Sequence, residues 1–181
     1  MRLDFFNHLV GIYGRLNLVD NRGSRSLLTQ NITDKVVGAD LSWRWFRAGA
    51  EHEVFDSNLG PFRSKRLFES FGIEPMAGSH LSLDLDQTWT SFTDDGRHRT
   101  AYNFIARFNT HFTSYLAWNV EVGYRVERGQ GFDQNMTIFR TGVEYTRNKL
   151  AVKLGFDMQD QDYLGELRQR NFFYLKAMRS F

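Results

Sequence analysis

Hydrophobic and polar residues alternate along most of this chain. The clearest stretch is residues 115–127, where every second residue from Leu116 to Val126 is apolar and the residues between them include Asn119 and Glu121. A period of two places successive side chains on opposite sides of a β-strand. The stretch is longer than the usual strand of about five or six residues. It matches the roughly 9–11 residues of a tilted strand that crosses a membrane, with a short overhang.

The same pattern predicts ten strands. They cover residues 3–19, 37–45, 48–56, 62–72, 81–89, 101–112, 115–127, 139–145, 149–159 and 171–181. No stretch shows the 3.6-residue apolar period of an amphipathic helix. The expected fold is therefore all-β, with antiparallel up-and-down strands in one domain, residues 1–181.

The predicted connections are short at one end of the strands and longer at the other. Tight reversals are expected at Phe46-Arg47, Thr113-Ser114 and Arg147-Asn148, with a somewhat longer one at residues 73–79. Longer polar loops are expected at residues 20–31, 57–61, 93–99, 128–133 and 160–169. This asymmetry is typical of transmembrane β-barrels.

Composition excludes several classes of protein. Hydrophobic residues make up 41% of the 181 residues and aromatic residues 15%, yet no run approaches the roughly 20 apolar residues of a membrane helix. The absence of cysteine excludes disulfides, a thiolate zinc site and a cysteine nucleophile. A net charge of +2 is too small to favour a nucleic-acid-binding protein. Membrane strands stay compatible with these numbers because alternation hides their apolar half.

The aromatic and charged residues favour a membrane barrel over a soluble one. The aromatic residues expected at the membrane interfaces lie near strand ends: Trp43, Trp45, Phe112, Trp118, Tyr145 and Phe181 by the tight turns, and Trp89, Tyr102, Tyr124, Phe156 and Phe173 toward the longer loops. Charges of both signs occupy the polar positions and are expected to line the lumen: Asp84, Asp86, Arg107, Glu121, Arg125, Arg140, Glu144, Lys153 and Asp157. A soluble up-and-down barrel that binds an apolar ligand remains the alternative, with the apolar set turned inward.

The C-terminal segment, residues 171–181, resembles the last strand of Gram-negative outer-membrane β-barrels. Phe181 ends the chain, and Phe173, Leu175 and Ala177 precede it at alternate positions, whereas Arg179 departs from the pattern. The resemblance implies a transmembrane β-barrel of about ten strands in the cell outer membrane. It further implies contact with outer-membrane lipid and lipopolysaccharide, and recognition of the last strand by the barrel-insertion machinery. If the chain is the C-terminal part of a larger barrel, the resemblance is to porin-like barrels that export polysaccharide or enclose electron-transfer cytochromes, with periplasmic partners.

The N-terminal segment does not decide between three origins of this chain. Residues 1–8 lack the apolar run and the small-residue cleavage site of a secretory signal. A removed signal, a fragment of a longer chain and a cytoplasmic protein all remain possible on this ground.

Few residues suggest catalysis or metal binding. Asp94, Asp95 and His98 could form the site of an omptin-like outer-membrane hydrolase, but an Asp-Asp-Gly-Arg turn is expected more strongly. Asp84 and Asp86 are expected to pair with Arg107 or another basic neighbour rather than to bind a cation.

Two further motifs are weak. His80 and His111 lack a third metal ligand, and the glycines of Arg128-Gly129-Gln130-Gly131 connect two strands instead of opening a helix. The expected function is thus a porin-like channel or structural scaffold with a charged lumen, with no enzymatic activity, cofactor, metal or nucleic-acid partner.

Overall fold

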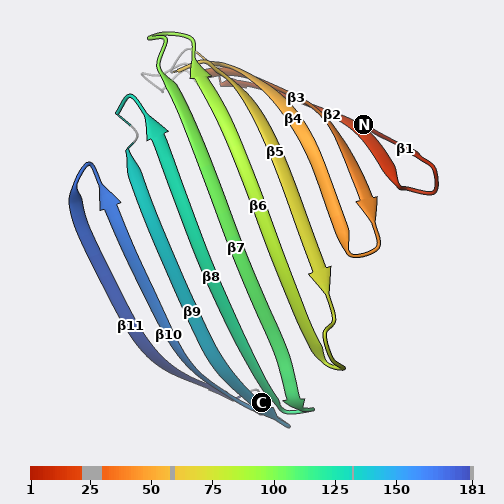
Figure 1. Ribbon diagram of the computed structural model, residues 1–181, viewed down its shortest axis with the longest axis vertical. Helices are drawn as coiled ribbons and strands as arrows, with labels where there is room; N and C mark the ends of the chain where they lie inside the picture. Colours follow the sequence, from red (N-terminus) through yellow and green to blue (C-terminus); the bar gives the residue numbers. More distant parts are fainter. Residues whose placement is uncertain (22–29, 58–59, 132, 180–181) are drawn as a thin grey trace. The chain divides into compact units, whose positions relative to one another are not determined.

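The computed structural model describes residues 1–21, 30–57, 60–131 and 133–179. These residues form eleven antiparallel strands in one sheet, and the strand order follows the chain (Figure 1). The strands are β1 (Arg2–Phe5), β2 (Val10–Asn21), β3 (Gln30–Trp43), β4 (Phe46–Ser57), β5 (Phe62–Ile73), β6 (Ser79–Phe92), β7 (His98–Thr113), β8 (Leu116–Gly129), β9 (Gln134–Arg147), β10 (Leu150–Tyr163) and β11 (Glu166–Arg179). The predicted all-β, antiparallel up-and-down fold is confirmed. No helix within the described residues has the length and apolar character needed to cross a bilayer.

The described residues form one strand more than the ten predicted, because residues 3–19 contain a turn. Phe6, Asn7 and His8 have positive φ angles of 51°, 57° and 66°. The Leu9 amide donates to the carbonyl of Phe6 at 3.2 Å. This left-handed turn reverses the chain, so β1 pairs with the first part of β2, from Arg2 opposite Tyr13 to Phe5 opposite Val10.

The tight turns lie one or two residues from their predicted positions. Two-residue connections occur at residues 44–45, 114–115 and 148–149. Arg44 and Asn148 adopt positive φ angles of 46° and 53°. Such angles give two-residue turns the twist that antiparallel strands require.

The predicted loop at residues 160–169 is wrong. The backbone ladder of β10 and β11 continues through Asp160 opposite Gln169 and Asp162 opposite Leu167 to Tyr163 opposite Glu166. Only Leu164 and Gly165, with φ angles of 52° and 87°, form the turn. Ladder hydrogen bonds come from the backbone, so a strand can continue where polar side chains erase the apolar alternation.

The sheet has two edges, and the chain divides into two compact units. Among the described residues each strand pairs only with its neighbours in sequence, so β1 and β11 each have one unpaired side. The first unit comprises Met1–Glu69, Asp86–Tyr102 and Arg128–Phe132. The second comprises Ser70–Leu85, Asn103–Glu127 and Asp133–Phe181.

Replacing Gly165 by valine should destabilise the β10–β11 hairpin. A side chain with a Cβ pays about 1–2 kcal/mol in the left-handed region, and a β-branched residue is poorly suited to it. Urea unfolding followed by tryptophan fluorescence should show this loss. Asn148→Gly is the matched control, because glycine readily adopts the angle already present there, and it should leave the unfolding free energy unchanged or slightly raised. Equal stability of Gly165→Val and the unaltered protein would contradict the turn geometry.

Candidate functional site

Large apolar side chains are exposed on these strands and carboxylates are buried, which is the reverse of the arrangement in water-soluble proteins. On β3, Asp40 is 3% exposed, whereas Val37 and Trp43 are 62% and 64% exposed. Residues directly opposite each other in an antiparallel ladder point to the same side. We therefore distinguish a polar side, which carries Asp40 and its cross-strand partners, from an apolar side, which carries Val37 and its partners.

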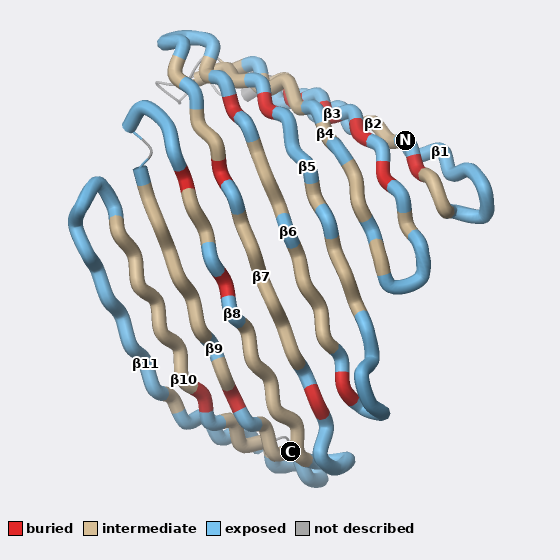
Figure 2. The backbone as a smooth tube through the Cα atoms, in the orientation of Figure 1, coloured by how far each residue is buried: buried red, intermediate tan, exposed pale blue. Residues whose placement is uncertain are grey.

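Among the described residues, more polar and charged residues than hydrophobic residues are buried. The buried hydrophobic residues are Val36 and Ala101 alone. Buried polar or charged residues are more numerous: Asp34, Asp40, Ser64, Ser79, Thr90, Thr110 and Glu127. Figure 2 shows the buried positions as short separate segments along the strands rather than as one continuous core. The described chain thus lacks the apolar core by which a soluble domain of this size is stabilised.

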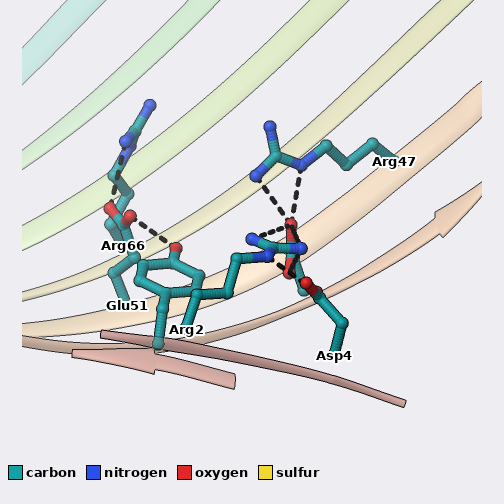
Figure 3. Close-up of polar contacts among 7 residues, drawn as sticks. Arg2, Asp4, Arg47, Glu51 and Arg66 are labelled. Carbon is teal, nitrogen blue, oxygen red and sulfur yellow. Dashed lines mark hydrogen bonds and ion pairs between the residues drawn. The ribbon is translucent and has the colours of Figure 1, made fainter. Parts of the chain in front are cut away.

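In the first unit, buried carboxylates on the polar side are held by arginines from other strands (Figure 3). The Asp40 side chain has no exposed surface and lies 3.0 Å from Nη2 of Arg2 and 2.6 Å from Nη2 of Arg47. Arg2 also reaches Asp4 at 2.7 Å. Two cations on one carboxylate compensate its removal from water.

A second group lies on the same side of the first unit. The Tyr13 hydroxyl donates to Oε1 of Glu51 at 2.6 Å, and Nη1 of Arg66 lies 3.0 Å from Oε2 of the same carboxylate. Arg66 also pairs with Asp86. The prediction that Asp86 pairs with Arg107 or another basic neighbour is confirmed, and the partner is Arg66.

In the second unit, Arg107 is the centre of a corresponding network. Its Nη1 lies 2.6 Å from Oδ2 of Asp84, and its Nε lies 2.9 Å from Oε2 of Glu121. Arg140 pairs with the other oxygen of Glu121 at 2.8 Å. The predicted pairing of Asp84 with Arg107 is confirmed. Negatively and positively charged side chains therefore alternate from β6 through β7 and β8 to β9.

The other predicted charged residues take different positions on this side. Arg125 pairs with Glu127 on its own strand. Glu144 lies opposite Lys153, and Lys153 lies opposite Lys176. Asp157 lies opposite Arg140. A cavity of about 250 Å³ lies beside five of these charged residues, Arg107, Glu121, Arg140, Lys153 and Asp157. Its other lining residues are Asn109, Asn119, Val120, Thr141 and Tyr174.

The predicted interface aromatics lie on the apolar side, apart from Trp45, which is in a turn. Those that are exposed are Trp43, Trp45, Trp89, Tyr102, Phe112, Tyr124 and Phe173, and those that are half-buried are Trp118, Tyr145 and Phe156. The rings of Phe156 and Phe173 pack in a tilted arrangement with centroids 4.4 Å apart. They lie in the middle of β10 and β11 and not near a loop, because both strands extend further than predicted. Phe181 lies outside the described residues.

Aromatic rings cover glycines on the polar side, a feature that the sequence did not reveal. Tyr13 is opposite Gly38, and Tyr174 is opposite Gly155. A Cβ added to Gly38 would lie 2.6 Å from the Tyr13 ring, and one added to Gly155 would overlap the Tyr174 ring. Glycine at these positions therefore allows the ring to lie against the backbone of the next strand.

The loop residues considered for catalysis have other partners. The Arg97 backbone amide donates to Asp95 at 3.0 Å and the Arg97 side chain adds a second bond, which together lower the pKa of Asp95. A general acid at neutral pH needs the opposite shift. Nδ1 of His98 lies 3.0 Å from the Ser91 hydroxyl. None of these contacts involves Asp94.

His111 and Gly129, from the two weak motifs, each lie against a backbone carbonyl group. Nδ1 of His111 lies 3.3 Å from the carbonyl oxygen of Gly78 and donates to it. Gly129 has a φ of 146°, and a Cβ there would overlap the His98 carbonyl, so this glycine is required by close backbone approach. Across the described ranges no three His, Asp or Glu side chains gather as a group that could hold a metal ion. A comparison with known protein families finds no match for this chain, and neither does a comparison with curated proteins.

Gly155→Ala should destabilise the protein by about 1–3 kcal/mol, because the added methyl group displaces the Tyr174 ring. Equilibrium unfolding in urea measures the loss. The double variant Gly155→Ala/Tyr174→Ala should show a coupling between the two sites. Gly14→Ala is the control, since its nearest neighbour, the Val36 carbonyl, would lie at an ordinary 3.6 Å. Equal losses at Gly14 and Gly155 would contradict the proposed ring packing.

Arg107→Met should cost about 1–3 kcal/mol of unfolding free energy, because it leaves Asp84 without its cation and Glu121 with one fewer. The Arg107 side chain is 39% exposed, so water compensates part of the loss. Arg168→Met is the matched control, since the Arg168–Glu166 pair is about 70% exposed and should contribute less than about 1 kcal/mol. Equal effects of both substitutions on urea unfolding would show that the Arg107 network does not stabilise the fold.

Proposed function

We propose that this chain is a transmembrane β-barrel protein of the Gram-negative outer membrane. It serves as a porin-like channel or structural scaffold with a charged lumen, and it has no catalytic role. The observation that carries the proposal is the exposure of large apolar side chains on one side together with the burial of carboxylates such as Asp40 on the other. In a bilayer, lipid covers the apolar side, so its exposure has no cost there.

Strand length supports this proposal. The strands from β6 to β11 have 14 to 16 residues. A tilted strand needs about 9–11 residues to cross a membrane, so several residues of each strand extend beyond the hydrocarbon. Trp43 and Phe112 lie beside the two-residue turns, and Trp89 and Tyr102 lie toward the other ends of their strands. Aromatic side chains at such positions suit the two membrane interfaces.

The sheet edges need partners in lipid. Unpaired backbone amides and carbonyls cost several kcal/mol each in hydrocarbon. The edges of β1 and β11 either pair with each other, which closes an eleven-stranded barrel, or pair with further strands of a larger barrel. An eleven-stranded barrel has a narrow lumen, which large charged side chains would largely fill. It would act as a scaffold, whereas a larger barrel would act as a channel.

β11 is the strand proposed to contact the insertion machinery. Phe173, Leu175 and Ala177 occupy alternate positions of β11 and are exposed on the apolar side. This arrangement provides a continuous apolar row on an edge strand. The row supports recognition by strand addition at that edge.

Leu154→Arg tests the side that faces lipid. Leu154 is 57% exposed on the apolar side of β10. An arginine there should cost about 2–4 kcal/mol in a bilayer, depending on depth, and should reduce folding into phosphatidylcholine vesicles. In a water-soluble protein the same exposed substitution would be nearly neutral. Gel mobility with and without boiling measures the folded fraction.

Gln159→Arg is the control on the polar side of the same strand, and it should fold into vesicles as the unaltered protein does. Detergent-free solubility as a monomer, together with mobility unchanged by boiling, would overturn the membrane proposal. Single-channel recording of the inserted protein then separates the two roles. Steady large conductance indicates a channel, and its absence indicates a scaffold.

A further inference from the structure

The apolar side of β5 carries unexpected basic residues. Ser64 donates to Glu53, and Arg66 pairs with Glu51, so both point to the polar side. By alternation Arg63 and Lys65 lie on the apolar side, and both are exposed. On β3 the same side carries a single cation, Lys35, and apolar residues such as Val37 and Trp43.

A hollow surrounds these two residues within the first unit. It has a volume of about 720 Å³ and is lined by His52, Arg63, Ser64, Lys65, Trp89 and Ser91. His52 lies directly opposite Val37 and therefore shares the apolar side. Nδ1 of His52 donates to the carbonyl of Ser64 at 3.0 Å, which orients the ring. We name these six residues the basic pocket.

The cations of the basic pocket lack acidic partners. Within the described ranges no carboxylate forms an ion pair with Arg63 or Lys65, and none lines the pocket. Glu69 is the next acidic residue on this side of β5, four residues from Lys65, or about 13 Å along the strand. Arg47, Arg66 and Arg107, by contrast, all meet carboxylates on the polar side. The pocket therefore presents uncompensated positive charge.

The surroundings of the pocket are amphiphilic. Leu67 follows Lys65 on the same side of β5 and is 48% exposed, and Trp89 of β6 is 37% exposed. Arg63 and Lys65 are near the start of β5, so the charge lies toward the strand end and Leu67 lies further along the strand. Trp89 lines the pocket and suits a membrane interface. A free anion would use only the charged part of this surface, whereas a lipid would use both parts.

We propose that the basic pocket binds the phosphate-bearing headgroup of an anionic lipid, whose acyl chains extend over Leu67. The proposal rests on the membrane function proposed above. Arg63 supplies a planar guanidinium that can hold two phosphate oxygens, and Lys65 supplies a second cation. The hollow accommodates the headgroup beside the Trp89 ring.

The test compares lipid binding by the full chain refolded in dodecyl maltoside micelles. Titration with phosphatidylglycerol should show saturable binding, which Arg63→Ala/Lys65→Ala should weaken about 10- to 30-fold. Phosphatidylcholine should bind more weakly than phosphatidylglycerol to the unaltered protein and should be little affected by the substitutions. Inorganic phosphate at the same concentration should not compete.

Arg44→Ala/Lys149→Ala is the matched control, because it removes one arginine and one lysine from turns outside the pocket. It should bind phosphatidylglycerol as the unaltered protein does. Equal weakening by both double variants, or competition by inorganic phosphate, would overturn the lipid site while leaving the membrane function intact. If the unaltered protein does not fold in micelles or vesicles, both proposals fail.

Discussion

A carboxylate that is withdrawn from water needs a cation close to it, and for Asp40 and Asp84 of this sheet the cation comes from another strand. Asp40 of β3 is held by Arg2 of β1 and Arg47 of β4, and Asp84 of β6 is held by Arg107 of β7. These pairs require one register of the backbone ladder. A slip by one residue would move every charged side chain to the other side and leave it unpaired. Charge pairing and strand register therefore stabilise each other.

The same register arranges the opposite side. Because side chains alternate, the register that pairs the charges on the polar side also places residues such as Val37 and Leu154 on the other side. The aromatic rings of Tyr13 and Tyr174, which lie over glycines, add packing to the polar side without an apolar core. The basic pocket of β5 is a local departure from this division. Its unpaired cations are consistent with a ligand that carries the compensating negative charge.

Alternation predicted the strand class, the antiparallel order and most of the residues on each side. It missed the turn between β1 and β2, although the apolar positions change phase there, from Leu3 and Phe5 to Val10 and Ile12. It also placed a loop at residues 160–169, because charged and amide side chains hide a ladder that the backbone maintains. The pairing of Asp84 with Arg107 was predictable, since both belong to neighbouring strands with a clear pattern. The group of Arg2, Asp40 and Arg47 was not, because it joins residues from three strands whose registers have to be known first.

The order of residues alone determines that each strand has one apolar and one polar side, since this follows from a period of two and from covalent geometry. It does not determine which side is sheltered, because exposure belongs to the assembled sheet and not to a strand. Only the tertiary structure showed that Asp40 is buried while Trp43 is exposed. The tertiary structure also decided which cations remain unpaired. Alternation places Arg63 and Arg66 on opposite sides of β5, but only the register shows that Glu51 and Asp86 lie beside Arg66.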